Sequence, residues 1–346
     1  MTDDTTASRN PRILIFGAGS VGCYLGGRLL SAGADVVMVG RQRLVELFRE
    51  QPLVVTDYGG FRFETHLAPG QFVTDVHAAG TPDVVIVSVK SAATRDAARQ
   101  LALHLPANTP VISMQNGISN AQRLEAELPE ATVLPGMIGF NVLQQEPGHF
   151  HHGTEGELMC ARHPSLATVT PLFASAGIPL EERDDMRSVL WSKLLLNLNN
   201  AINALSGRPL LEQLSQRDYR RCLAMAQKET LQLLKQAGIP TVRLTPLPMA
   251  LIPPLMRAPD WLFSRLFGSM LAIDPIARSS MWEDLEAGRP TEVDWLNGEV
   301  VRLAEQLGTR APVNAQLTDL VHHREQQPRS WSATELLAQL GGAEGS

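Results

Sequence analysis

The feature that most constrains the fold is a glycine-rich turn close to the N-terminus. Gly17, Gly19 and Gly22 form a GxGxxG pattern directly after the apolar run 12–16, and a helical pattern follows as far as about Ala32. In this context the first glycine permits a tight turn, the second lets the backbone approach a phosphate, and the third allows close helix packing. The pattern therefore predicts a site for the pyrophosphate of a dinucleotide, held by Gly17, Gly19, Ser20, Val21 and Gly22.

The first half of the chain alternates short β-branched runs with longer segments of helical period. This alternation is typical of βαβ units around a parallel sheet, and we predict a Rossmann-type domain with strands at 12–16, 35–39, 84–89 and 110–114. The continuous apolar character of these runs indicates strands that helices cover on both faces. Two antiparallel hairpins, 53–56 with 61–64 and 148–157 with 158–161, are expected to extend the edge of the sheet.

After about Asp184 strand signals disappear and amphipathic helical segments take over, at 189–205, 219–237, 261–271, 291–307 and 314–325. We therefore predict an α/β protein whose C-terminal domain is all-α. The expected organisation is a loose tail (1–11), an NADP-binding Rossmann domain (12–184) and a helical substrate and dimerisation domain (185–340). The Pro-rich interval 245–259 is the least regular part, and it fits a lid, an insertion or an oligomer contact.

Composition excludes several classes of partner. The chain carries 30 Lys and Arg against 36 Asp and Glu, and it has no basic run or basic helix face that would neutralise successive phosphates of a nucleic acid. No window approaches the roughly 18 apolar residues of a membrane span, and the polar start lacks the features of an export signal. Its three cysteines, Cys23, Cys160 and Cys222, have no metal-ligand spacing. We expect a cytoplasmic protein with buried thiols.

The end of the second predicted strand indicates which cofactor is used. An NAD-specific domain carries an acidic residue here for the ribose hydroxyls, but this chain has Arg41 and Arg43, and no acid before Glu46. A guanidinium makes a two-pronged contact with a 2′-phosphate. We therefore predict NADP (NADPH) with Arg41 as its phosphate ligand; the alternative is a solvated turn residue.

Several motifs in fixed order resemble those of the ketopantoate reductase (2-dehydropantoate 2-reductase) family, which is related to 6-phosphogluconate dehydrogenase. They are GAGSVG at 17–22, SVKS at 88–91, MQNG at 114–117, WSKLLLN at 191–197, SSM at 279–281 and TEVD at 291–294. The resemblance implies a C-terminal domain like that of 6-phosphogluconate dehydrogenase. It also implies NADPH-dependent reduction of ketopantoate to pantoate, a step of pantothenate and coenzyme A biosynthesis. Together with the apolar stretch 251–267, it favours a homodimer.

Hydride delivery to a ketone leaves charge on the carbonyl oxygen, which must be stabilised or protonated. Lys193 lies in an apolar helical stretch, where desolvation would lower its pKa, and the resemblance makes it the catalytic acid. A surface lysine with a buried stem is the alternative. Helical spacing puts Asn197 and Asn200 on the same face as Lys193, as substrate ligands, although interhelical hydrogen bonding would also explain asparagines here.

The remaining candidates are assigned by the resemblance. Glu292, at the expected start of a helix after a Thr291 cap, faces the active site and influences the lysine, and Ser280 binds the substrate carboxylate. Asn116 lies near nicotinamide and substrate, and Lys90 contacts the cofactor. The structural alternatives are helix capping for Glu292 and an Asn-Gly turn for Asn116.

Two asparagines that the family would place in the substrate pocket are alanines here, Ala201 and Ala277. This difference leaves the identity of the 2-oxo acid open. Two other functions stay as alternatives: a related NADP-dependent dehydrogenase of a 2-oxo or 3-hydroxy acid, and a sensor that binds NADPH without chemistry.

Overall fold

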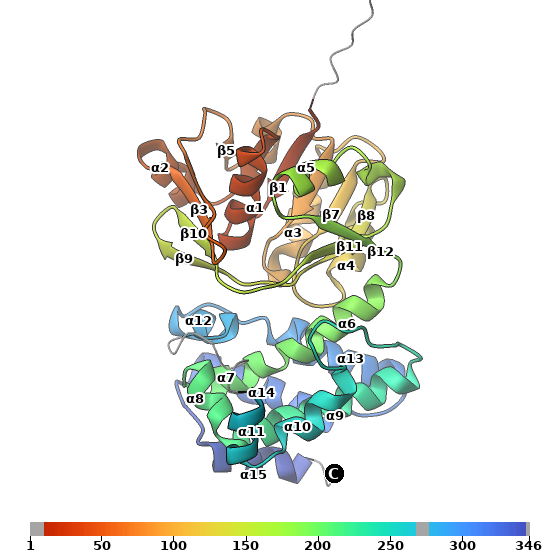
Figure 1. The fold of residues 1–346 in the computed structure, drawn as a ribbon. Helices are drawn as coiled ribbons and strands as arrows, with labels where there is room; N and C mark the ends of the chain where they lie inside the picture. The colour runs from red at the N-terminus through yellow and green to blue at the C-terminus, as the bar shows by residue number, and fades with distance from the viewer. Residues whose placement is uncertain (1–9, 268–276, 344–346) are drawn as a thin grey trace, which may run out of the picture. The chain divides into compact units, whose positions relative to one another are not determined.

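The computed structural model describes residues 10–267 and 277–343 and divides into two compact units, with the boundary between Met186 and Arg187 (Figure 1). The first unit contains an eight-stranded sheet in the order β12-β11-β8-β7-β6-β1-β2-β5. Its strands are β1 (Arg12–Phe16), β2 (Asp35–Val39), β5 (Phe72–Val73), β6 (Val84–Val87), β7 (Pro110–Ser113), β8 (Thr132–Ile138), β11 (Leu158–Ala161) and β12 (Leu180–Arg183).

Strands β5, β2, β1, β6, β7 and β8 are mutually parallel, and β1 lies between β2 and β6. The strand order therefore reverses beside β1, and ligands of open parallel sheets bind beyond the carboxyl ends of the strands at such a point. The helices of this unit are α1 (Ser20–Ser31), α2 (Gln42–Glu50), α3 (Thr94–Ala102), α4 (Asn120–Glu127) and α5 (Thr170–Ser175), with short 3₁₀ turns at η1 (Val76–Ala79), η2 (Ser91–Ala93) and η3 (Pro164–Leu166).

Alternate residues of β1 pack into different cores. Ile13 and Ile15 belong to a core that includes Leu25 of α1, whereas Leu14 and Phe16 belong to a second core with residues of α3 and α4. Because both faces of the strand are covered, its sequence is a continuous apolar run instead of an alternating one. The predicted parallel sheet is confirmed.

A second sheet has four strands in the order β4-β3-β10-β9, and it shares no strand with the first sheet. It contains β3 (Leu53–Asp57), β4 (Arg62–Thr65), β9 (Val142–Glu146) and β10 (His149–His152). The hairpin of β3 with β4 was predicted correctly, but it does not extend the large sheet. The hairpin predicted across 148–161 is wrong, because β10 pairs with β9 and β3, while β11 pairs with β8 and β12.

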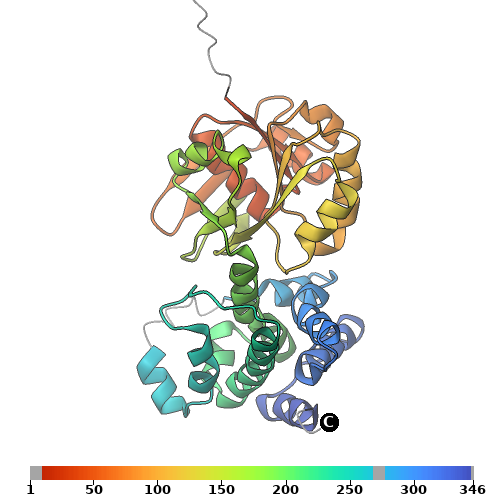
Figure 2. The ribbon, with the colours of Figure 1, turned by 90° about the vertical axis from the view of Figure 1, so that its right-hand side faces the viewer.

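The second unit is built from helices, and the described residues after Arg183 contain no strand (Figure 2). The helices are α6 (Met186–Asn197), α7 (Asn199–Ser206), α8 (Leu210–Ser215), α9 (Arg217–Gln236), α10 (Ile252–Met256), α11 (Asp260–Phe267), α12 (Ser280–Glu286), α13 (Asn297–Gln306), α14 (Pro312–Gln326) and α15 (Ala333–Ala343), with 3₁₀ turns η4 (Met249–Leu251) and η5 (Val293–Trp295). The predicted all-α character is confirmed.

Two long predicted helices are each divided. The segment 189–205 is interrupted at Leu198, between α6 and α7, and the segment 291–307 consists of η5 followed by α13. The C-terminal part of the predicted helix 261–271 lies outside the described residues. The Pro-rich interval 245–259 folds into η4 and α10, and Pro253 and Pro254 stand in the first turn of α10, where a missing N–H costs no helical hydrogen bond.

Candidate active site

The glycine turn between β1 and α1 is fixed by the backbone around it. Gly17 has a φ of +103°, and a Cβ there would lie 2.5 Å from the amide nitrogen of Val89. The amides of Gly17 and Ala18 both donate to the carbonyl of Val39, at 3.0 and 2.9 Å. The turn is therefore attached to the carboxyl end of β2, and Gly17 is required by the protein itself.

Gly19 is different, because none of the described residues comes close enough to require a glycine there. Its φ is −89°, and a Cβ built on it would meet only the carbonyl oxygen of Gly17, at 4.0 Å. The residue is exposed and precedes α1, which has no side-chain cap and no acid in its first turn. Such a helix start offers the amides of Ser20, Val21 and Gly22 to an anion. The open space at Gly19 and these amides together fit a pyrophosphate.

The residues directly after β2 carry positive charge, and no carboxylate occurs before Glu46. Arg41 is exposed at the N-terminal end of α2, and no ion pair joins it or Arg43 to another described residue. Asp35 is not available to a ribose, because it pairs with Arg12 at 2.8 Å at the start of the strands. Since Val39 accepts hydrogen bonds from the glycine turn, Arg41 lies only two residues along the chain from that contact.

Lys90 and Asn116 follow β6 and β7, two neighbouring strands of the large sheet. The two chain segments are joined by hydrogen bonds: the side-chain amide of Gln115 donates to the Val89 carbonyl at 2.9 Å, and the Ser91 hydroxyl donates to the Asn116 carbonyl at 3.2 Å. The structure therefore brings these two predicted residues to the edge of the sheet that also carries the glycine turn.

Sequence reasoning named the SVKS and MQNG segments but missed the positioning residues inside them. The Ser88 hydroxyl donates to the Gly17 carbonyl at 3.0 Å, and Gln115 also donates to Thr94 Oγ1 at 2.8 Å. The side chain of Asn120 donates to the Asn116 carbonyl and to Ser91. Their position just after parallel strands was the available signal, but only coordinates show which backbone groups they hold.

In the second unit, Lys193 on α6 is itself partly buried, and its neighbours Ser192 and Leu194 are fully and almost fully buried. Burial lowers the pKa of the Lys193 ammonium to about 8. The helix is anchored on both sides of the lysine, because the Ser192 hydroxyl accepts from the Val242 amide at 2.8 Å and the Leu195 carbonyl accepts from Gln227 at 3.1 Å. An amine with this pKa exchanges protons near neutral pH.

Asn197 follows Lys193 by one turn on α6, so the two side chains leave the same face of the helix. Asn200 lies beyond the break at Leu198, and its backbone carbonyl accepts from the Ser279 hydroxyl at 3.3 Å. This contact attaches the start of α12 to α7, and Ser280 is the next, exposed residue. The structure thus brings Asn200 and Ser280 to one region of the helical unit.

The two alanines differ in their surroundings. Ala201 is fully buried in α7, whereas Ala277 is partly exposed and its carbonyl accepts from the Leu210 amide at 2.9 Å. Asn203, which lies one turn beyond Asn199, accepts from the Ser279 amide at 3.0 Å and donates to the Arg208 carbonyl. The Asn203 side chain therefore hydrogen-bonds backbone groups of other segments, as the alternative of interhelical hydrogen bonding predicts.

Glu292 does not stand at the start of an α-helix, as the sequence suggested, but directly before the 3₁₀ turn η5. Thr291 precedes this turn, and its hydroxyl accepts a hydrogen bond from the Val293 amide, the first amide of η5, at 3.4 Å. The amide of Thr291 donates to Glu325 at 2.8 Å, which fixes this segment on α14. Glu292 itself is partly buried.

Metal sites and membrane spans are not found in the described part of the chain. No group of three or more His, Cys, Asp or Glu side chains there is suited to a metal ion, and none of its helices is both long and apolar enough to cross a membrane. The three thiols are buried, and burial raises the pKa values of Cys160 and Cys222 to about 12, so neither forms a thiolate readily.

Comparison with protein families gives two consecutive matches. Residues 13–165 match the model described as ketopantoate reductase PanE/ApbA, and residues 185–325 match the model of its C-terminal part. The chain belongs to the ketopantoate reductase family. It is an oxidoreductase of this family, and the glycine turn is the part of the chain that fits the family's nicotinamide cofactor.

The relatives of this ketopantoate reductase family member cover nearly its whole length. A 2-dehydropantoate 2-reductase of Pyrococcus abyssi is 26% identical over 324 residues, which are 91% of this chain and 98% of the relative. The enzyme of that name from Halobacterium salinarum is 28% identical, over 90% of this chain and 97% of the relative. A ketopantoate reductase from Ralstonia eutropha has a TM-score of 0.78 and 29% identity, covering 91% and 99% of the two chains.

A structure of D-mandelate dehydrogenase with NADH and anilino(oxo)acetate has a TM-score of 0.77 at 18% identity, and covers 91% of this chain and 98% of that one. At this identity the likeness concerns the fold alone. The predicted fold class, a Rossmann-type domain followed by a helical domain, is confirmed by the structure and by these neighbours.

Proposed function

We propose that the chain catalyses the NADPH-dependent reduction of a small 2-oxo acid, with ketopantoate as the first substrate to test. The observation that carries this proposal is Lys193, whose pKa burial lowers to about 8 on a helix that also presents Asn197. A binding protein without chemistry has no need of an amine tuned in this way. The names of the relatives point to the same reaction.

The reaction defines the role of Lys193. A nicotinamide bound at the glycine turn would supply a hydride to the carbonyl carbon, and the carbonyl oxygen would then need a proton. At pH 7 most Lys193 is protonated, because its pKa is about 8, and proton donation to this oxygen is easier than from an ordinary lysine. In the reverse direction the neutral amine accepts the proton from the alcohol.

We assign the remaining residues by chemistry. Asn197 and Asn200 are amides that hydrogen-bond the oxygens of the substrate, and Ser280 is the hydroxyl for its carboxylate. Glu292 hydrogen-bonds the substrate and influences Lys193. Asn116 and Lys90 act from the dinucleotide-binding unit, on the nicotinamide end of the cofactor.

Preference for NADP rests on Arg41. Its guanidinium is exposed beside the carboxyl end of β2, the acid that would bind ribose hydroxyls is absent, and Arg43 adds positive charge. We also propose that the enzyme works in the cytoplasm as a homodimer. A ketopantoate reductase from Staphylococcus aureus, similar in fold, is described as dimeric.

Ala201 and Ala277 favour a second candidate within the same chemistry, the reduction of a 2-oxo acid other than ketopantoate. Each alanine removes an amide that would hydrogen-bond a polar substrate. A substrate with fewer polar groups loses less by this change than ketopantoate does, because it leaves fewer groups unpaired.

The test is the oxidation of NADPH, followed at 340 nm, with ketopantoate, unbranched and branched 2-oxo acids, and an aromatic 2-oxo acid. A panel of 3-hydroxy acids with NADP tests the alternative dehydrogenase. Turnover of ketopantoate above the other acids supports the first assignment, and turnover of another 2-oxo acid supports the second. Binding of NADPH without turnover of any compound would refute both and leave a nucleotide sensor.

A further inference from the structure

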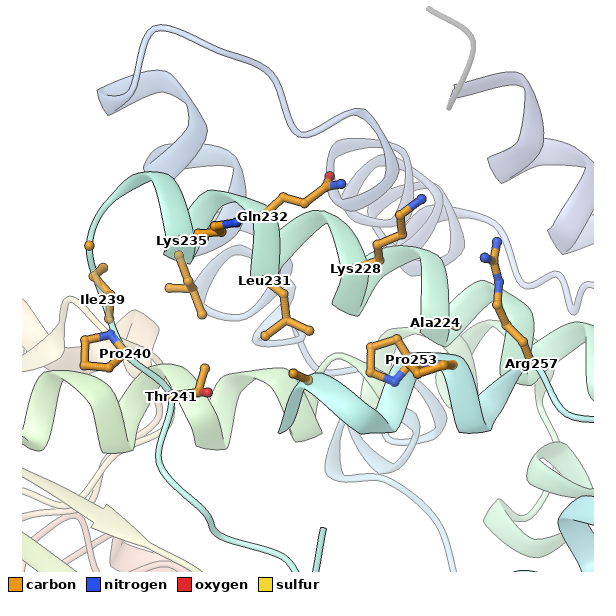
Figure 3. A pocket seen from close by; sticks show the side chains of 14 residues that line it. Ala224, Lys228, Leu231, Gln232, Lys235, Ile239, Pro240, Thr241, Pro253 and Arg257 are labelled. Atoms are coloured by element: carbon orange, nitrogen blue, oxygen red, sulfur yellow. The ribbon is translucent and has the colours of Figure 1, made fainter. Parts of the chain in front are cut away.

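The helical unit contains a large apolar hollow that the proposed reaction does not use. It has a volume of about 1010 Å³ and lies between the C-terminal half of α9, the segment that follows it, and α10 (Figure 3). Leu231 and Leu234 of α9, Ile239 and Pro240 after the helix, and Pro253 of α10 supply apolar surface. Small-molecule sites commonly occupy roughly 300–1,000 Å³, so the size suits a ligand.

Among the described residues, every charged side chain that borders this hollow is positive. Lys228, Lys235 and Arg257 are among the residues that line it, and no Asp or Glu of the described ranges is. All three are exposed, and none is ion-paired with a carboxylate within residues 10–267 and 277–343. By contrast, Arg220 and Arg221 on the same helix are paired with Asp260 and Asp218. Unpaired cations around an apolar floor favour an anionic partner.

Figure 3 shows how charge and apolar surface are distributed. Lys235 stands at the end where Ile239 and Pro240 lie, whereas Lys228 and Arg257 stand at the other end, with Leu231 between them. Leu231 points from α9 toward the side of Pro253, and the lysines leave the helix on another side. Their long stems border the hollow while the ammonium groups stay in solvent, within reach of an anion at its mouth.

Prolines restrict the backbone on two sides of the hollow. Pro240 follows α9, and Pro253 and Pro254 form the first turn of α10, so the backbone angles of both walls are restricted. A ligand therefore finds apolar surface that is already formed, and little conformational entropy is lost when it binds.

We propose that this hollow binds an amphipathic carboxylate, with an alkyl chain against Leu231, Leu234 and Pro253 and a carboxylate held by Lys228 and Arg257 at one end. This inference does not depend on the proposed reductase activity, since every residue involved lies away from the candidate catalytic groups in sequence and none is among them.

A second copy of the chain is a less suitable occupant. In a two-fold symmetric contact the same patch faces itself, which would bring the three cations of one copy close to those of the other and remove them from water without partners. An anionic ligand instead neutralises the charges that border the apolar floor.

The experiment is calorimetric titration of the full-length protein with decanoate below the concentration at which it forms micelles. Decanol and decyltrimethylammonium, which have the same alkyl length, serve as neutral and cationic probes. We expect decanoate to bind most tightly, decanol about fivefold more weakly, and the cation not at all. Equal binding of all three compounds would show adventitious apolar adsorption and would overturn the proposal.

Variants locate the binding. Lys228→Glu should weaken decanoate about fivefold without changing decanol, and Leu231→Asn should weaken both. Arg310→Glu is the matched control, because Arg310 is exposed in the same unit, lies outside the lining and gives the same change of net charge. If Arg310→Glu weakens decanoate as much as Lys228→Glu does, the effect is one of overall charge and the site is refuted. Absence of decanoate binding, together with a dimer that Leu231→Asn dissociates in light scattering, would assign the hollow to self-association.

Discussion

The glycine turn of the first unit and the Lys193 helix of the second differ in what determines their chemistry. At Gly17 and Gly19 the relevant property belongs to the backbone: one residue adopts a positive φ against Val89, and the other leaves open space above a helix start. At Lys193 the property belongs to the surroundings, because burial lowers the pKa of an amine on a helix that α9 and the segment after it hold by hydrogen bonds. Backbone geometry is encoded locally, whereas a pKa is set by residues distant in sequence.

The largest expected effect comes from removing the amine. Lys193→Met keeps the length and apolar character of the side chain, and the rate of substrate reduction at saturation should fall about 10³-fold, because the proton donor is lost. The Kd of NADPH, measured by fluorescence titration, should stay within about twofold. Ser192→Ala would disturb the same helix without removing the amine and serves as the control. Full activity of Lys193→Met would refute the assigned role.

The second prediction separates the two kinds of glycine. Gly19→Val should raise the Kd of NADPH roughly 100-fold, because the side chain fills the space where a pyrophosphate would lie, while the melting temperature changes little. In Gly22→Ala, by contrast, the new Cβ lies 2.7 Å from the Gly17 carbonyl oxygen, so the protein should lose about 2 kcal/mol of stability. Equal loss of stability in both variants would contradict the ligand role of Gly19.

The difference between the two regions also explains which parts of the fold can be predicted from the sequence. Strand–turn–helix spacing suffices to predict β1, the turn and α1, since each step depends on neighbours in the chain. The pairing of β10 with β3, and of β11 with β8 and β12, could not be predicted, because these partners lie far along the chain. The hairpin of β10 with β9, its direct neighbour, was missed because β10 was assigned to β11 instead. An apolar run shows that a strand exists but not which sheet it joins.

The candidate site shows the same limit. Lys193 was assigned from a family motif, because a lysine in an apolar helix is as readily a surface residue, and only the fold shows its burial. The helix expected to begin at Glu292 is a 3₁₀ turn, since Thr291 caps only Val293 and the α-helix starts at Asn297. Capping residues predict that a turn begins, but the length of that turn depends on packing.

The third prediction concerns Arg41, where local sequence again carries the argument. Arg41→Asp should lower kcat/KM with NADPH roughly 30-fold, because the guanidinium that pairs with a 2′-phosphate is lost. It should also raise the ratio of kcat/KM with NADH to kcat/KM with NADPH, because the new carboxylate accepts hydrogen bonds from ribose hydroxyls. Arg49→Asp, on the same helix but in its last turn, is the matched control. An unchanged ratio in Arg41→Asp would place 2′-phosphate recognition elsewhere.

The smallest effect is expected from pH, and it tests the surroundings of Lys193 without a mutation. Because the acid form donates the proton and its pKa is about 8, kcat/KM for reduction should fall roughly tenfold per pH unit above that value. A profile that stays flat to pH 10 would refute the lowered pKa or the role of the lysine.

The pH dependence of stability distinguishes these two explanations. Between pH 8 and 10.5, the ordinary pKa of lysine, the unfolded chain binds more protons at Lys193 than the folded chain does. The free energy of unfolding should therefore rise with pH over this range. Lys193→Met should lack the part of this rise that the lysine contributes, whether or not the lysine takes part in catalysis.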